Sequence, residues 1–138
     1  MPLFRENKES RVKNFVLKLV NNNCPEMKAM FDGPRRDSRV NLTIVVMVIP
    51  LEGEDLRIGE AFTAVTKEFS ASGTAIVLDR QIGLDKVVLA FRFDGEKMFV
   101  RAKARHLSPI GGGFHQLGFE MIEVVSPGDY PKLLAVDF

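Results

Sequence analysis

Six short runs of β-branched and aromatic residues follow one another through most of the chain after residue 40. No helical periodicity separates them, and residues 94–97 carry a hairpin signal, while Gly111-Gly112-Gly113 reads as a loop. Short strands at this spacing favour a closed antiparallel barrel over a parallel sheet, which needs helical crossovers. The predicted strands cover residues 42–49, 61–66, 74–78, 87–93, 98–106 and 115–125.

The chain before residue 34 follows a helical period instead. Apolar residues at i, i+3, i+4, i+7 and i+8 predict a helix over residues 7–20, stopped by Asn21-Asn22-Asn23 and by Pro25. We therefore expect an N-terminal helical extension over residues 1–33 and a barrel domain over residues 34–138, with a short C-terminal helix within residues 127–136. The apolar face of the first helix has two readings, packing on its own barrel or a homodimer contact. Its residues are Val12, Phe15, Val16, Leu19 and Val20.

Composition agrees with one small domain and limits its partners. The 138 residues carry 19 basic and 18 acidic side chains, a formal charge of +1, so no global signature of nucleic-acid binding is present. The single cysteine, Cys24, excludes an internal disulfide and a multi-cysteine metal site. No apolar stretch reaches the ~18 residues of a membrane span, and the N-terminus lacks a signal-peptide core, so the expected location is cytoplasmic.

Positive charge is concentrated in one segment, Arg35-Arg36-Asp37-Ser38-Arg39, directly before the first predicted strand. Arginine binds phosphate oxygens through a planar fork, stacks on bases, and pairs with the O6 and N7 atoms of guanine. The alternative reading is a solvated approach to the strand with surface ion pairs.

A second segment, Glu68-Phe69-Ser70-Ala71-Ser72-Gly73, lies between the second and third predicted strands. A carboxylate only accepts hydrogen bonds, so Glu68 would receive the N1 and N2 donors of guanine. Serine and glycine are also ordinary turn residues, so Ser70 and Gly73 have a purely structural alternative. Taken together, the two segments predict a site for a phosphate that carries a purine.

This pair of motifs resembles the PilZ domain, the bacterial receptor module for cyclic di-GMP. Arg35 and Arg39 match the R-x-x-x-R motif of that family, and Ser70 and Gly73 match its [D/N]-x-S-x-x-G motif. Residues 117–120 are similar to its glycine-containing closing strand, and residues 34–125 fit overall. The resemblance implies a six-stranded β-barrel with cyclic di-GMP bound by Arg35, Arg36, Arg39, Glu68, Ser70 and Gly73.

The chain departs from the family pattern at Glu68, where the family has Asp or Asn. Glutamate adds one methylene, which changes the reach of the carboxylate and costs more side-chain entropy to order. The departure weakens the ligand expectation more than the fold expectation.

No enzyme constellation is present in the sequence, and Ser70 has no evident base. The expected function is a non-enzymatic receptor that binds cyclic di-GMP and signals to an unidentified protein partner as ligand orders the arginine segment. The first alternative is a PilZ-like protein-interaction domain that binds no nucleotide. A weaker alternative, a barrel for single-stranded nucleic acid, is disfavoured by the near-zero net charge.

Overall fold

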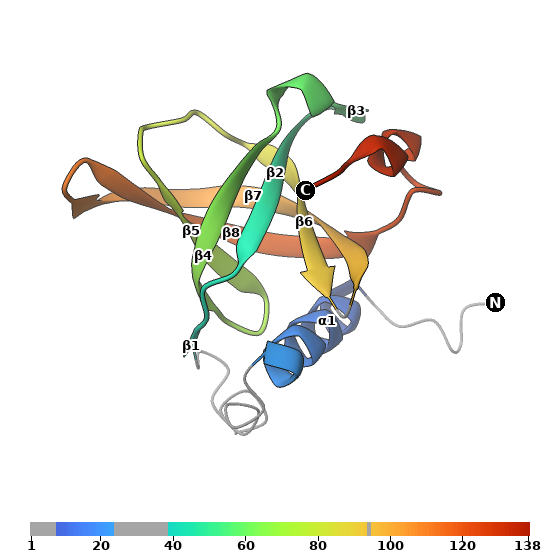
Figure 1. The fold of residues 1–138 in the computed structure, drawn as a ribbon, viewed down its shortest axis with the longest axis horizontal. Helices are drawn as coiled ribbons and strands as arrows, with labels where there is room; N and C mark the ends of the chain where they lie inside the picture. Colours follow the sequence, from blue (N-terminus) through green and yellow to red (C-terminus); the bar gives the residue numbers. More distant parts are fainter. Residues whose placement is uncertain (1–7, 24–38, 94) are drawn as a thin grey trace.

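A closed six-stranded antiparallel barrel forms the body of the computed structural model, which describes residues 8–23, 39–93 and 95–138 (Figure 1). The strands follow the order β2–β4–β5–β8–β7–β6 around the barrel, and β6 pairs with β2 to close it. This architecture confirms the mainly β prediction. The strands are β2 (Val45–Glu52), β4 (Phe62–Phe69), β5 (Gly73–Leu78), β6 (Lys86–Phe93), β7 (Glu96–Gly111) and β8 (Phe114–Val125).

The first predicted strand, residues 42–49, is split in the structure. A short β1 (Val40–Asn41) pairs with the end of β4, and β2 begins only at Val45. Between them the buried Thr66 hydroxyl donates to the Leu42 carbonyl oxygen (2.6 Å) and accepts from the Ile44 N–H (3.0 Å). The Thr66 side chain thus satisfies two backbone groups of this segment, while backbone hydrogen bonds to β4 persist from the Leu42 N–H to Lys67 and from the Thr66 N–H to Ile44.

Two further short elements, β3 (Asp55–Leu56) and the 3-10 helix η2 (Ile58–Glu60), follow β2 and were not predicted. Strands β7 and β8 continue past their predicted limits into one long hairpin, which projects to one side in Figure 1. Gly111, Gly112 and Gly113 close that hairpin with positive φ angles of 99°, 64° and 83°, a conformation that favours glycine.

The N-terminal helix α1 (Lys8–Asn23) lies across one end of the barrel (Figure 1). Val12, Phe15 and Val16 are buried in the interior cluster, which confirms packing on the chain's own barrel for these three residues. The Phe15 ring lies 5.3 Å from the Phe91 ring, and Phe91 lies 6.0 Å from the Phe69 ring. The helix therefore shares one core with the strands.

The helix ends later than predicted, because Asn21, Asn22 and Asn23 form its last turn instead of stopping it. Asparagine has only a modest helix penalty, which a packed apolar face offsets. The predicted division at residue 33 lies outside the described residues and stays a prediction, as does the homodimer contact.

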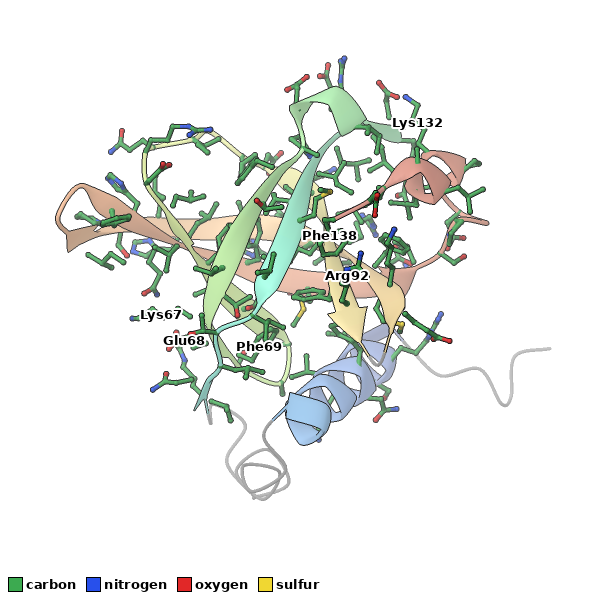
Figure 2. All side chains as sticks on the ribbon, in the orientation of Figure 1. Lys67, Glu68, Phe69, Arg92, Lys132 and Phe138 are labelled. Atoms are coloured by element: carbon green, nitrogen blue, oxygen red, sulfur yellow. The ribbon has the colours of Figure 1, made fainter. Side chains whose placement is uncertain are left out.

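A second apolar cluster covers the outer face of β2, β6 and β7. The C-terminal 3-10 helix η3 (Pro131–Ala135) stands where a short helix was predicted, and its Leu133 packs with Ile49 and Val88 in this cluster. Lys97 Nζ donates to the Val136 carbonyl oxygen (2.5 Å), and Arg92 lies over the Phe138 ring at 5.3 Å. Figure 2 shows Arg92, Phe138 and Lys132 on this side, away from Glu68.

Candidate functional site

Arg39 and Glu68, one from each sequence motif, meet in the structure. Asn41 pairs with Glu68 across β1 and β4, which carries Arg39 to the end of β4. The Arg39 Nη1 atom donates to Glu68 Oε1 at 2.9 Å. The Arg39 side chain is 65% exposed, whereas that of Glu68 is 19% exposed. The Glu68 carboxylate is therefore partly buried against the barrel, whereas the Arg39 guanidinium faces solvent.

A β-bulge in β4 explains why Glu68 faces outward. Thr66 pairs with Ile76 and Glu68 with Ala75, so Lys67 is an extra residue on β4. Without it, strand alternation would place Glu68 on the same inner face as the buried Thr66. The bulge instead lets Lys67 and Glu68 both face outward, and the next residue, Phe69, points into the core.

The turn between β4 and β5 holds Ser70 and Gly73 beside Glu68. The Ser70 N–H donates to the Gly73 carbonyl oxygen (2.9 Å), and the Thr74 hydroxyl donates to the Glu68 carbonyl oxygen (2.9 Å). A Cβ on Gly73 would lie only 2.8 Å from the Phe119 carbonyl oxygen. Glycine is thus required here by the close approach of β8, and its φ angle lies outside the left-handed region.

A second bulge, in β7, shapes the facing wall. Ala104 pairs with Phe119 and His106 with Gly118, so Arg105 is the extra residue. Ala104 and Leu107 pack against the interior cluster, and both residues between them are exposed. This second bulge therefore presents two neighbouring polar side chains, Arg105 and His106, on the outside of the barrel.

The floor between the two walls is made of small residues. Glu68, Ala75, Gly118 and His106 face one another in register across β4, β5, β8 and β7. Of the two central residues, Ala75 contributes only a methyl group, and Gly118 has no side chain. A Cβ on Gly118 would meet only the His106 carbonyl oxygen, at 3.8 Å, so the backbone does not demand glycine there. The absent side chain leaves the floor flat and open.

These walls and this floor enclose a pocket of about 360 Å³, called the motif pocket below. Its described charged groups are two arginines and two glutamates, in the pairs Arg39–Glu68 and Arg105–Glu120. The lining includes Arg39, Glu68, Ser70, Ser72, Gly73, Ala75, Arg105, His106, Gln116, Gly118 and Glu120. Arginine forks above a flat, uncharged floor suit a planar ring that carries anionic oxygens.

Four of the residues predicted from the motifs, Arg39, Glu68, Ser70 and Gly73, line this one pocket. Arg35 and Arg36 lie outside the described residues, so their positions stay predictions.

The motifs missed Arg105, His106, Gln116, Gly118 and Glu120. A signal for the bulges exists in the sequence: two adjacent polar residues interrupt the alternation at Lys67-Glu68 and at Arg105-His106.

Other kinds of site find little support in the structure. Within residues 8–23, 39–93 and 95–138, no three His, Cys, Asp or Glu side chains gather closely enough to hold a metal ion. Among the same residues, no helix combines the length and the apolar character needed to cross a membrane.

Comparison with known proteins identifies the fold. No protein-family model matches the sequence, and no curated protein matches it. Among solved structures, the chain is similar to the Bacillus subtilis inhibitor of motility, MotI/DgrA, with a TM-score of 0.52 and 17% identity. The match covers 75% of this chain and 49% of that one, so the chain spans about half the length of MotI/DgrA. The likeness concerns the fold, and it agrees with the six-stranded antiparallel barrel that the motifs led us to expect.

Proposed function

We propose that this chain is a receptor module that binds cyclic di-GMP in the motif pocket and passes the signal to a protein partner. The observation that carries the proposal is the meeting of Arg39 and Glu68 at the rim of one pocket, beside Ser70 and Gly73. Residues from two separate motifs converge there on a floor shaped for a planar ring. The fold is shared with MotI/DgrA, an inhibitor of motility, and the two motifs resemble those of the PilZ family of cyclic di-GMP receptors.

The chemistry of the pocket fits guanine better than adenine. The Glu68 carboxylate only accepts hydrogen bonds, and the Watson–Crick edge of guanine offers two donors, N1–H and N2–H. The same edge of adenine places an acceptor at N1, which the carboxylate would repel. Ala75 and Gly118 leave room for the face of the base, and Arg39 supplies a fork for a phosphate or for the O6 and N7 atoms.

The Arg39–Glu68 ion pair would be rearranged when the ligand binds. Arg39 is mostly exposed, and exposed ion pairs contribute only about 0–1 kcal/mol, so giving up this contact costs little. A charge-assisted bond from Arg39 to phosphate contributes more, about 1.5–3 kcal/mol. We include Arg35 and Arg36 in the proposed site, and we expect ligand to order residues 33–40 and so alter the surface offered to a partner.

The test is calorimetric titration of the chain with cyclic di-GMP and cyclic di-AMP, for the wild type and Arg39→Ala. We expect binding of the guanine ligand only, and a loss of at least ~2 kcal/mol in Arg39→Ala, because arginine is a frequent hot spot. Arg80→Ala is the matched control, since Arg80 pairs with its neighbour Asp79 outside the pocket. The assignment is wrong if Arg39→Ala binds as tightly as the wild type. Slower amide exchange across residues 33–40 with ligand would support the ordering step.

A second candidate function rests on a different surface. Val45 and Val65 are exposed neighbours across β2 and β4, and with Phe114 they line an apolar groove of about 720 Å³. The described charges of the motif pocket also cancel in two ion pairs. Both observations favour a protein-interaction domain without nucleotide. Absence of cyclic di-GMP binding by the folded wild type would select this alternative.

A further inference from the structure

Arg105 belongs to neither sequence motif, yet the bulge in β7 directs it to the motif pocket. Its Nε atom donates to Glu120 Oε1 at 2.8 Å, and its Nη2 atom donates to the same oxygen. The fork of Arg105 is thus already presented to one anionic oxygen at the pocket. The carboxylate oxygen of Glu120 occupies the place that a phosphate oxygen would take.

The Arg105–Glu120 pair is easily exchanged. The Arg105 side chain is 55% exposed and that of Glu120 is 43% exposed, and an exposed pair of this kind adds little to stability. A phosphate entering the pocket would meet attraction from Arg105 and repulsion from Glu120. Both effects of Glu120, its hold on Arg105 and its own charge, oppose an anionic ligand.

We propose that Arg105 binds a phosphate of the ligand and that Glu120 competes for the same guanidinium, so that Glu120 sets the affinity of the motif pocket. The inference rests on the proposed function and deepens it. It names a binding residue outside both motifs and a carboxylate of this chain that acts against the ligand.

The test is a double-mutant cycle at fixed ionic strength, with cyclic di-GMP as the probe and calorimetry as the readout. Arg105→Ala should weaken binding about tenfold or more, because it removes a phosphate-binding fork. Glu120→Gln should tighten binding by about threefold to tenfold, because the competing charge is gone. In the Arg105→Ala background, the gain from Glu120→Gln should shrink, because no guanidinium remains to be released.

The neighbouring pair Arg101–Glu123 is the matched control. It joins the same two strands, β7 and β8, through the same donors, Nε and Nη2, and neither residue lines the motif pocket. Arg101→Ala and Glu123→Gln should leave the affinity for cyclic di-GMP unchanged within about twofold, because these charges lie outside the pocket and are screened by salt. Thermal unfolding of each variant separates loss of fold from loss of binding.

The outcomes discriminate clearly. Wild-type affinity in Arg105→Ala overturns the inference, and so does an equal gain from Glu120→Gln in both backgrounds, which would make Glu120 a nearby charge and not a competitor. Either result leaves the proposed function intact if the wild type binds. If the folded wild type binds no cyclic di-GMP, the proposed function itself fails and the inference fails with it.

Discussion

The two outer faces of the barrel are built by opposite rules. Where η3 covers β2, β6 and β7, strand β6 pairs with both neighbours without a register shift, and the outward residues are apolar. On the motif-pocket face, the pairing of β4 with β5 and the pairing of β7 with β8 both contain bulges, and the outward residues are charged, polar or small.

This difference shows how a barrel can combine a rigid core with a polar site. Regular pairing gives strict alternation, which suits a face buried under apolar side chains such as Leu133 and Tyr130. A bulge adds an outward position without removing an inward one, so the interior stays packed while the outside gains a second polar group. The motif pocket is therefore made by irregularities in strands whose inner faces remain packed in the core.

The largest effect expected from this comparison is on stability at the covered face. Leu133 is buried and its neighbour Leu134 is 79% exposed. Leu133→Ala should lower the free energy of unfolding by about 2–5 kcal/mol, while Leu134→Ala should change it by less than about 0.5 kcal/mol. Denaturant unfolding measures both. Ligand affinity should be unchanged in both variants, and a weakened affinity in Leu133→Ala would contradict the independence of the two faces.

A smaller effect, on binding alone, is expected at the floor of the motif pocket. Gly118→Val places methyl groups over the floor, and it should weaken cyclic di-GMP binding by about tenfold or more with little loss of stability, because the new Cβ meets no close neighbour. The control is Gly83→Val, at a loop position with nothing within 4 Å of a Cβ and no positive φ. Calorimetry measures the affinity for cyclic di-GMP, and thermal unfolding measures the stability of each variant. Undiminished affinity in Gly118→Val would mean that the ligand does not lie on this floor.

The smallest effect concerns acid pH on the covered face. The Lys132 ammonium donates to Asp55 at 2.6 Å, and this hydrogen bond and charge hold the pKa of the Asp55 carboxyl below its usual value. The stabilisation is present above the unfolded pKa and is lost as pH falls through the lower folded pKa. The unfolding midpoints of the wild type and Asp55→Asn should therefore begin to converge as pH falls below about 5, toward the ordinary pKa of Asp, and should meet only below the lowered folded pKa. A constant difference would contradict this linkage.

Sequence reasoning predicted the strands well, because their β-branched runs carry a clear period. It placed all six barrel strands and the helix that buries Phe15. It placed the start of β2 too early, because the buried hydroxyl of Thr66, from a distant position in the chain, binds the Leu42 carbonyl oxygen and the Ile44 N–H in place of regular strand partners. Hydrophobic patterns contain no information about such a side chain contact.

The candidate site was only partly predictable. The motifs marked Arg39 and Glu68, and their meeting follows from pairing between β1 and β4. Arg105 and Glu120 escaped notice because an arginine and a glutamate on two adjacent strands look like an ordinary surface ion pair in sequence. Their significance depends on the register shift in β7: the adjacent polar residues Arg105 and His106 hint at a bulge, but only the strand partners show that it directs Arg105 to the pocket.

The bulge in β4 makes the site depend on the number of residues as well as on their identity. Lys67 contacts Gln116 through its ammonium group, yet its main contribution is to occupy one position between Thr66 and Glu68. Substituting Lys67 would therefore have little effect on the site, whereas deleting this one residue would turn Glu68 toward the interior. Among homologous chains, a one-residue deletion at this point would be a stronger sign of a lost site than many substitutions.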